Sequence, residues 1–282
     1  MSKIKTIFMG TPEFAVPSLE ALNDKVDLIA VVTQPDKPKG RGHKLMPSPV
    51  KSWALDHSIP VLQPIKIKTE EATAELEALK PELIVVVAFG QILSQKILDI
   101  PKYGCINVHA SLLPRYRGAA PIEWSIINGE TKTGVTTMMM DAGLDTGDML
   151  IKREVEIGED MILPELREKL MTIGAEALIE TIERLENGTL TRNKQDDSQS
   201  NYAPMLTKET GLIDWNKSAR EIHNLVRGLY GGAYTIIDDQ KYKIWRTQIV
   251  NDLIEILEIQ APNSKRMNYK DFLRGHKDFK IF

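Results

Sequence analysis

Three short, continuous apolar runs constrain the fold of this chain more than any other feature of its sequence. They span residues 4–10, 26–33 and 83–88, have the length of single strands, and are rich in Val and Ile. Strands that form unbroken hydrophobic runs are typical of parallel sheets that are buried on both faces. Helical patterns separate the runs, one opening at Pro12 and another covering residues 70–79. We therefore expect an α/β fold with a Rossmann-like, mostly parallel sheet that carries helices on both faces.

The rest of the sequence predicts a second, smaller domain. Residues 105–109, 134–140 and 149–156 have strand patterns, and a long helical stretch over residues 162–187 ends at Asn187-Gly188. The polar stretch 195–204 lacks periodicity and is interpreted as a linker. After it, the pattern predicts a helix over residues 218–229, a hairpin of residues 233–238 and 241–250 around Asp239-Gln240, and a strand over residues 252–260. We predict a first domain over residues 1–188, a linker over 189–204 and a small β-rich domain over 205–282.

Composition excludes several classes of protein. Hydrophobic residues make up 42% and charged residues 27% of the chain, as in ordinary globular proteins. The single cysteine cannot form an intrachain disulfide, no run of about 18 apolar residues predicts a membrane span, and the N-terminus is too mixed for a signal peptide. The formal net charge of −3 argues against a uniformly basic nucleic-acid binder. We expect a cytoplasmic, monomeric protein in which any contact with nucleic acid uses a local patch.

The common nucleotide and metal signatures are absent from the sequence. The first predicted turn between strand and helix, residues 10–15, contains one glycine, whereas a nicotinamide or flavin nucleotide calls for G-x-G-x-x-G. The patterns G-x-x-x-x-G-K-[ST], C-x-x-C and H-E-x-x-H do not occur, and the five histidines are scattered. We therefore expect neither a P-loop ATP site nor a metal site.

Polar residues at the ends of predicted strands indicate acyl chemistry. Asn107 and His109 are two residues apart on one strand, so their side chains leave the same face near the edge where α/β sheets bind ligands. Asp145 lies in a loop with glycines, residues 141–148, after another strand. A carboxylate can orient a histidine that carries a proton, and an asparagine can donate to an oxyanion. A lone histidine at a strand end is more often structural, but Asn107, His109 and Asp145 together favour acyl transfer by direct attack. Cys105 is expected to be a core residue and not a nucleophile.

Four segments of the chain resemble the 10-formyltetrahydrofolate-dependent formyltransferases, namely residues 9–17, 34–42, 107–124 and 140–148. The third segment, NVHASLLPRYRGAAPIEW, is long and specific to that family. The resemblance implies that Asn107, His109 and Asp145 are catalytic, that 10-formyltetrahydrofolate is the co-substrate, and that no metal takes part. It further implies that the folate is bound by Phe89, Gly90, Gln91, Ile92 and Leu93 and by Ser111, Leu112, Leu113 and Pro114.

The first two of these segments and the second domain favour the family members that act on methionine carried by initiator tRNA. The resemblance implies that the α-amino group of methionine attacks the formyl carbon directly, through a tetrahedral intermediate, before translation is initiated. Asn107 and protonated His109 are then expected to stabilise the oxyanion. Asp145 is expected to hold the imidazole and to accept the proton of the amine, directly or through water.

Two cation-rich regions are candidates for contact with tRNA. Residues 34–49 hold four Lys or Arg against Asp36 alone, among four prolines and two glycines that are expected to prevent regular structure. The resemblance implies that this loop binds tRNA through Lys37, Lys39, Arg41 and Lys44. Residues 241–282 hold nine Lys or Arg and five Asp or Glu, which suits the basic face of a small OB-like β-barrel that binds tRNA. A solvated charged surface is the alternative interpretation of both regions.

The predicted barrel is shorter than the family pattern. The family has two more residues in the region of 229–234 and further strands between Val250 and Asp252. Three strands are predicted here, too few to close a five-stranded barrel, so we expect residues of this domain to be absent from the sequence. A chain mass well above 31.8 kDa would show that they are.

Three other functions remain open from the sequence. One is a folate-dependent formyltransferase that acts on a nucleotide sugar or on glycinamide ribonucleotide, for which the basic loop and second domain would be unnecessary. The second is a hydrolase of formyl-folate, in which water replaces the amine. The third is a tRNA-binding protein with an inactive pocket, which would not need Asn107, His109 and Asp145.

Overall fold

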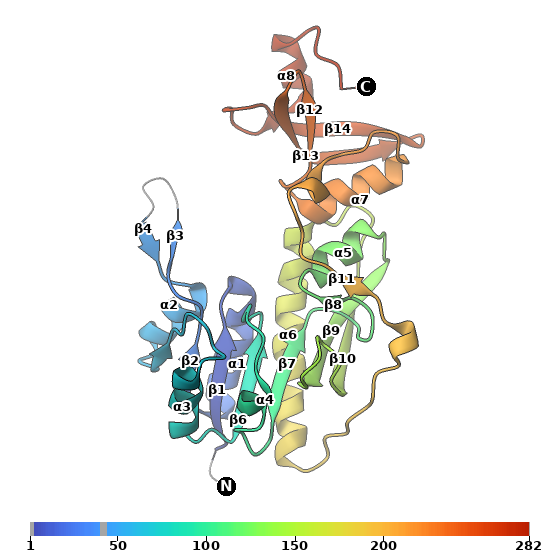
Figure 1. The fold of residues 1–282 in the computed structure, drawn as a ribbon. Coiled ribbons are helices and arrows are strands. Elements are labelled where there is room, and N and C mark those ends of the chain that lie inside the picture. The colour runs from blue at the N-terminus through green and yellow to red at the C-terminus, as the bar shows by residue number, and fades with distance from the viewer. Residues whose placement is uncertain (1–2, 40–43, 282) are drawn as a thin grey trace. The chain divides into compact units, whose positions relative to one another are not determined.

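The structure is a computed structural model that describes residues 3–39 and 44–281. The chain forms two compact units, which are described separately (Figure 1). Unit 1 consists of Met1–Arg117, Gly134–Glu154 and Glu168–Asn201, and unit 2 consists of Gly118–Thr133, Val155–Arg167 and Tyr202–Phe282.

Unit 1 contains a seven-stranded sheet in the order β10-β9-β7-β6-β1-β2-β5. Its strands are β1 (Lys5–Gly10), β2 (Asp27–Val32), β5 (Val61–Leu62), β6 (Leu83–Val87), β7 (Cys105–His109), β9 (Lys132–Met139) and β10 (Met149–Glu156). The pairs β5/β2, β2/β1, β1/β6 and β6/β7 are parallel, whereas β9 runs antiparallel to β7. The predicted α/β fold with a mostly parallel sheet is therefore confirmed.

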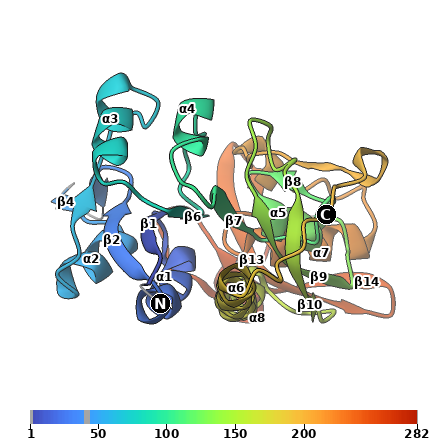
Figure 2. The same ribbon diagram turned by 90° about the horizontal axis from the view of Figure 1, so that it is seen from below.

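Helices cover both faces of this sheet, as expected from its buried strands. They are α1 (Val16–Lys25), preceded by the 3-10 turn η1 (Glu13–Ala15), and α2 (Pro49–Asp56), α3 (Glu70–Ala78), α4 (Gln95–Leu98) and α6 (Leu163–Glu186). Figure 2 shows α3 and α4 on one side of the central strands and α1 and α6 on the other. On the first side, Ile7 and Ile84 of the sheet share a buried cluster with Leu76 of α3 and Ile97 of α4.

The strand order puts a switch of direction between β1 and β6 of the sheet. Successive strands run outward from β1 through β2 to β5, and then from β6 to β7 on the other side of β1. The crevice at such a switch of direction, between the carboxyl ends of two parallel strands, is where open α/β sheets bind their ligands. The residues that follow β1, β6 and β7 are therefore the ones that can meet a ligand in unit 1.

Unit 2 combines helices with a four-stranded antiparallel sheet in the order β12-β13-β14-β15. Its elements are α5 (Pro121–Ile127), η3 (Glu209–Gly211), α7 (Ala219–Leu229), β12 (Tyr234–Ile237), β13 (Gln240–Val250), β14 (Leu253–Gln260), β15 (Met267–Asn268) and α8 (Tyr269–Gly275). Ile222 and Val226 of α7, Ile244, Ile259 and Phe272 form its core. A small C-terminal sheet domain is confirmed. Its sheet is open, with β12 and β15 at the two edges, as expected from too few predicted strands to close a five-stranded barrel.

Two hairpin turns connect the first three strands of this sheet, and each turn consists of two residues. Asn251 and Asp252 both have positive φ, at 49° and 62°, and connect Val250 directly to Leu253. Asp238 and Asp239, with φ of 48° and 57°, connect β12 to β13, so the first turn lies one residue before the expected Asp239-Gln240. Two consecutive residues with positive φ form the type of turn that matches the twist of a hairpin.

The basic loop is the clearest error in the predicted elements. Residues 34–49 were expected to lack regular structure, yet β3 (Lys37–Lys39) and β4 (Lys44–Met46) pair as an antiparallel hairpin. Pro38 lies opposite Leu45 in this pair. A two-stranded ribbon has only edge strands, and an edge strand tolerates proline because one side of it needs no hydrogen-bond donor.

The boundaries of the two compact units differ from the domain boundaries predicted at residues 188 and 204. Helix α5 and the segment Val155–Arg167 belong to unit 2 together with α7. A Cβ atom on Gly228 of α7 would come within 2.8 Å of Ile127, so this glycine lets α7 approach α5 closely. Part of the expected linker is ordered, with η2 (Asp197–Gln199) and with β11 (Tyr202–Ala203), which pairs with β8 (Arg117–Gly118). None of the described helices is both long and apolar enough to cross a bilayer.

Candidate active site

Strand β7 presents Asn107 and His109 at the carboxyl edge of the sheet. Both residues are buried, with 9% and 6% of their surfaces exposed, and the alternation of the strand puts their side chains on the same face. Within the described residues the Asn107 carboxamide has no hydrogen-bond partner. Because every fully buried side-chain nitrogen or oxygen there does have one, the carboxamide must keep some exposed surface. The Asn107 carboxamide is therefore open to a ligand and can donate to it.

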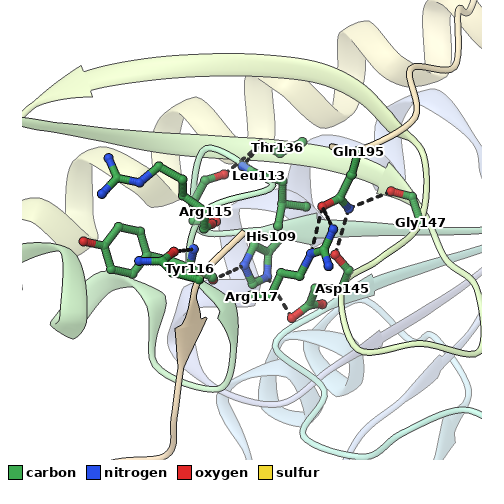
Figure 3. Close-up of polar contacts among 11 residues, drawn as sticks. His109, Leu113, Arg115, Tyr116, Arg117, Thr136, Asp145, Gly147 and Gln195 are labelled. Atoms are coloured by element: carbon green, nitrogen blue, oxygen red, sulfur yellow. Dashed lines mark hydrogen bonds and ion pairs between the residues drawn. The ribbon is translucent and has the colours of Figure 1, made fainter. Parts of the chain in front are cut away.

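The two ring nitrogens of His109 face different partners (Figure 3). Nε2 lies 2.9 Å from the carbonyl oxygen of Tyr116, and because that oxygen only accepts, Nε2 carries a proton. Nδ1 lies 3.6 Å from Oδ2 of Asp145, just beyond direct hydrogen-bond distance. Nδ1 is thus the ring nitrogen that faces the carboxylate.

Asp145 reaches His109 from the loop between β9 and β10. Its backbone has a φ of 55°, a left-handed conformation that Asp and Asn tolerate better than most residues. A Cβ atom on Gly147 would lie 1.7 Å from the carbonyl oxygen of Met139, so only glycine fits where the loop returns to the sheet. Oδ1 of Asp141 accepts from the amide of Gly143 at 3.0 Å and from the Thr146 hydroxyl at 2.7 Å. Of the loop's acidic residues, Asp141 organises the turn and Asp145 faces the histidine.

Sequence reasoning missed a residue that supports this loop. Nε2 of Gln195 donates to the carbonyl oxygens of Asp145 and Gly147, each at 2.8 Å. The polar, aperiodic stretch around Gln195 carried no signal for such a contact, because the pairing joins residues 50 positions apart.

The first predicted folate-binding stretch follows β6. Phe89 and Leu93 are buried in the unit 1 core, whereas Ile92 is 62% exposed. Oε1 of Gln91 accepts from the amide of Ile67 at 2.8 Å, and Gly90 has a φ of 83°. The loop therefore exposes Gly90 and Ile92 and buries Phe89 and Leu93.

Residues on neighbouring strand ends hold the backbone of that loop. The Thr11 hydroxyl and the Gln34 side chain both donate to the carbonyl oxygen of Phe89, at 3.0 and 3.2 Å. Gln34 also donates to the carbonyl oxygen of Gly90. The loop after β6 is thereby tied to the ends of β1 and β2, which lie across the switch point from β6.

The second predicted folate-binding stretch, Ser111 to Pro114, follows β7 directly and is held by side chains from the next strands. The Ser111 hydroxyl donates to the carbonyl oxygen of Arg115 at 2.6 Å. Thr136 donates to the Ser111 carbonyl and accepts from the Leu113 amide, and Lys152 donates to the Leu113 carbonyl. Leu113 is fully buried, whereas Leu112 and Pro114 are half-buried. Four hydrogen bonds thus hold the stretch that follows His109.

The predicted tRNA-binding residues lie on the β3–β4 hairpin, except Arg41, which lies outside the described residues. The side chain of Lys37 is exposed, and the backbones of Lys39 and Lys44 pair with each other. At the base of the hairpin, Lys51 donates to Asp36 at 2.7 Å, and this hydrogen bond holds the pKa of Asp36 below its ordinary value. The one acidic residue of the loop is thus neutralised by a lysine outside it.

Cys105 and the acidic groups offer no alternative chemistry in the described part of the chain. Burial raises the pKa of the Cys105 thiol to about 12, so it is protonated and unreactive, as its predicted place in the core implies. Among residues 3–39 and 44–281, no group of three or more His, Cys, Asp or Glu is placed to hold a metal ion.

Comparison with known proteins matches both parts of the chain. A family model for formyl transferase matches residues 2–182, and a model for the C-terminal domain of formyl transferase matches residues 205–254. The methionyl-tRNA formyltransferase of Ruminiclostridium cellulolyticum is 53% identical over 303 residues, which cover 97% of each chain. That of Geobacter metallireducens is 52% identical over 300 residues, covering 98% of this chain and 96% of the relative. Both alignments are longer than the 282 residues of this chain, so the relatives carry insertions.

Solved structures with the same fold include enzymes that formylate sugars. The sugar 3N-formyl transferase WlaRD, solved with dTDP and 5-N-formyl-THF, has a TM-score of 0.68 and 24% identity, covering 90% of this chain and 89% of that one. The N-formyltransferase from Helicobacter canadensis, solved with folinic acid and dTDP-3-aminofucose, has a TM-score of 0.66 and 23% identity, covering 92% and 95%. At these identities the likeness concerns the fold.

Proposed function

The chain belongs to the formyl transferase family, and we propose that it transfers the formyl group of 10-formyltetrahydrofolate to the α-amino group of methionine on initiator tRNA. A nitrogen–carbon bond forms between the amine and the formyl carbon, the bond from that carbon to the folate nitrogen breaks, and the proton of the amine replaces the formyl group on the folate. The product initiates translation, a cytoplasmic process, and a single chain supplies all of the residues of the site described above.

The single observation that carries the proposal is the convergence of Asn107, His109 and Asp145 at the edge of one sheet. When the amine attacks, negative charge develops on the formyl oxygen, and the unpaired Asn107 carboxamide can donate to it. His109, with a proton held on Nε2 by Tyr116, offers Nδ1 to the reacting atoms. Asp145 stabilises the imidazolium and can take up the proton of the amine, directly or through water.

The crevice also suits the folate. A pterin ring needs hydrogen-bond partners in a flat, partly apolar slot. The loop after β6 exposes Gly90 and Ile92, and the stretch after β7, which follows His109 directly, holds Leu112 and Pro114 half-buried. Both stretches are held by side-chain hydrogen bonds within the protein, which supports a site that needs little rearrangement on binding.

The tRNA would be bound by basic surfaces on both units. On unit 1 these are the cations of the β3–β4 hairpin. The acidic residue directly before the hairpin, Asp36, is already neutralised by Lys51. On unit 2 the Arg266 guanidinium lies 5.3 Å from the Tyr230 ring and 4.8 Å from the Trp245 ring, besides pairing with Glu258. Interleaved aromatic and cationic side chains on a sheet are typical of RNA-binding surfaces. We assign catalysis and folate binding to residues 1–188 and tRNA binding to residues 205–282.

A formyl-transfer assay tests the function directly. The purified chain is supplied with 10-formyltetrahydrofolate and, in parallel reactions, with methionyl initiator tRNA, a nucleotide amino sugar, glycinamide ribonucleotide, or no acceptor. We expect formyl-methionine on the tRNA, measured by mass spectrometry after mild hydrolysis of the ester. Formylation of the sugar or ribonucleotide alone, or release of free formate alone, would refute the proposal in favour of the corresponding alternative.

A further inference from the structure

Gln195 connects the loop of Asp145 to a segment that the sequence pattern assigns to a linker. We propose that Gln195 is a positioning residue, which holds Asp145 at the distance from His109 that formyl transfer requires. The inference rests on the proposed function for its kinetic consequence, but the contacts that carry it lie wholly within unit 1.

The amide of Gln195 holds the Asp145 loop by its backbone. Its two N–H groups are both used, one on the carbonyl oxygen of Asp145 and one on that of Gly147, each at 2.8 Å (Figure 3). These carbonyls bracket the point where the loop leaves the left-handed conformation of Asp145 and returns to the sheet. Fixing both carbonyls therefore fixes the direction of the Asp145 side chain.

The other end of the amide is fixed by Arg117. Oε1 of Gln195 accepts from Nε of Arg117 at 3.0 Å and from Nη2 at 2.8 Å. A guanidinium only donates and a carbonyl oxygen only accepts, so the amide has one possible orientation in this site. Nη2 of Arg117 also donates to Asp197 at 2.7 Å, which keeps the guanidinium in the plane that Gln195 needs.

The same segment supports the opposite side of His109. Oδ1 of Asn201 accepts from the amide of Tyr116 at 2.5 Å, and the carbonyl oxygen of Asn201 accepts from the amide of Arg117 at 3.0 Å. Tyr116 is the residue whose carbonyl oxygen receives Nε2–H of His109. Residues 195–201 thus fix the partners of both ring nitrogens.

The environment of Gln195 sets it apart from its neighbours. It is half-buried, whereas residues 191–194 and 196–199 are exposed. Gln195 does not touch the imidazole, so its effect on the reaction passes through Asp145. The gap of 3.6 Å between Nδ1 and Oδ2 leaves little tolerance, because a misplacement of about 1 Å can cost about 10² in rate.

The substitution Gln195→Glu separates a positioning role from a merely structural one. The carboxylate has the shape of the amide and pairs with Arg117 at least as well, so it preserves the anchoring of the segment. It cannot donate to the carbonyl oxygens of Asp145 and Gly147 and repels them instead. Gln195→Ala removes both sets of hydrogen bonds. The matched controls are Gln199→Glu and Gln199→Ala, because Gln199 lies exposed on the same segment and, among the described residues, its side chain hydrogen-bonds Asp196 and not the Asp145 loop.

Five quantities are measured for each variant: kcat, the KM for folate, the KM for tRNA, the thermal unfolding midpoint, and hydrogen–deuterium exchange of the peptide covering residues 141–148. We expect both Gln195 variants to lower kcat about 10–100-fold, with KM values within about twofold, and to exchange faster over residues 141–148. Both Gln199 variants should match the wild type.

Two results would overturn the inference. One is a Gln195→Glu variant with wild-type kcat and wild-type exchange, which would show that only the contact with Arg117 matters. The other is an equal loss in the Gln199 variants, which would point to general loosening of the segment. A wild-type chain that transfers no formyl group would instead refute the proposed function, and the exchange rates would still decide whether Gln195 holds the Asp145 loop.

Discussion

His109 depends on partners that the chain supplies from two different loops. Nε2 is held by the carbonyl oxygen of Tyr116, seven residues further along, whereas Nδ1 faces Asp145, 36 residues further along. The strand pattern predicted that Asn107 and His109 share a face, because alternation along a strand is a local property. The Tyr116 contact could not be predicted in this way, since it depends on the left-handed conformation of Tyr116, with a φ of 59°.

The charge of Asp145 can be separated from its backbone conformation by comparing two substitutions. Asp145→Asn keeps the shape and the tolerance for positive φ, so we expect a kcat about 10²–10⁴ lower with an unchanged unfolding midpoint. Asp145→Ala should lose as much activity and also about 1 kcal/mol of unfolding free energy, because alanine is strained at a φ of 55°. Steady-state kinetics and thermal unfolding measure both effects. A kcat for Asp145→Asn within tenfold of the wild type would remove Asp145 from the mechanism.

Elements with a strong hydrophobic period were predicted well, whereas those set by distant partners were not. The helix expected over residues 162–187 is α6, Leu163–Glu186, and the strand expected over residues 105–109 is β7. Both have patterns long or apolar enough to determine the element locally. Strands β3, β4 and β11 are each only two or three residues long, so they leave no periodic signal in the sequence. The same reason explains why Gln195 was assigned to a linker.

The β3–β4 hairpin allows a test of tRNA binding that does not disturb the folate. Lys37→Ala combined with Arg41→Ala removes two cations, and we expect a higher KM for tRNA and an unchanged KM for folate. Each phosphate contact contributes about one to the slope of log KM against log salt concentration, so the slope should fall by about two. Lys68→Ala is the control, because Lys68 is an exposed cation elsewhere in unit 1. If the slope stays at its wild-type value, the hairpin does not contact phosphate.

The net charge of −3 for the whole chain restricts how it can bind RNA. A nearly neutral protein gains little from non-specific attraction to phosphate, so its cations must be gathered in few places. Residues 34–49 and 241–282 are such places, and in the first the opposing charge of Asp36 is paired with Lys51, which lies outside that segment. A cationic side chain is buried in unit 2: Arg227 donates to the carbonyl oxygens of Gly158 and Met161.

The buried His223 makes the stability of the chain depend on pH through unit 2. Nδ1 lies 2.9 Å from the Thr247 hydroxyl and Nε2 lies 3.3 Å from the carbonyl oxygen of Glu159. Burial, together with the positive charges of Arg227 and Arg220, lowers the pKa of His223 below its ordinary value, although Asp160 opposes the shift. The unfolded chain therefore binds the proton more tightly than the folded chain does.

It follows that His223 contributes stability above the unfolded pKa of about 6.5, and that this contribution is lost as the pH falls from there through the folded pKa. The substitution His223→Gln removes the titration and keeps an amide that can donate to the Glu159 carbonyl. We expect the free energy of unfolding to fall between pH 7.5 and pH 5.5 more steeply in the wild type than in the variant, as measured by urea denaturation. Parallel curves for the two proteins would show that His223 titrates alike in the folded and unfolded states, and a steeper fall in the variant would reverse the sign of the argument.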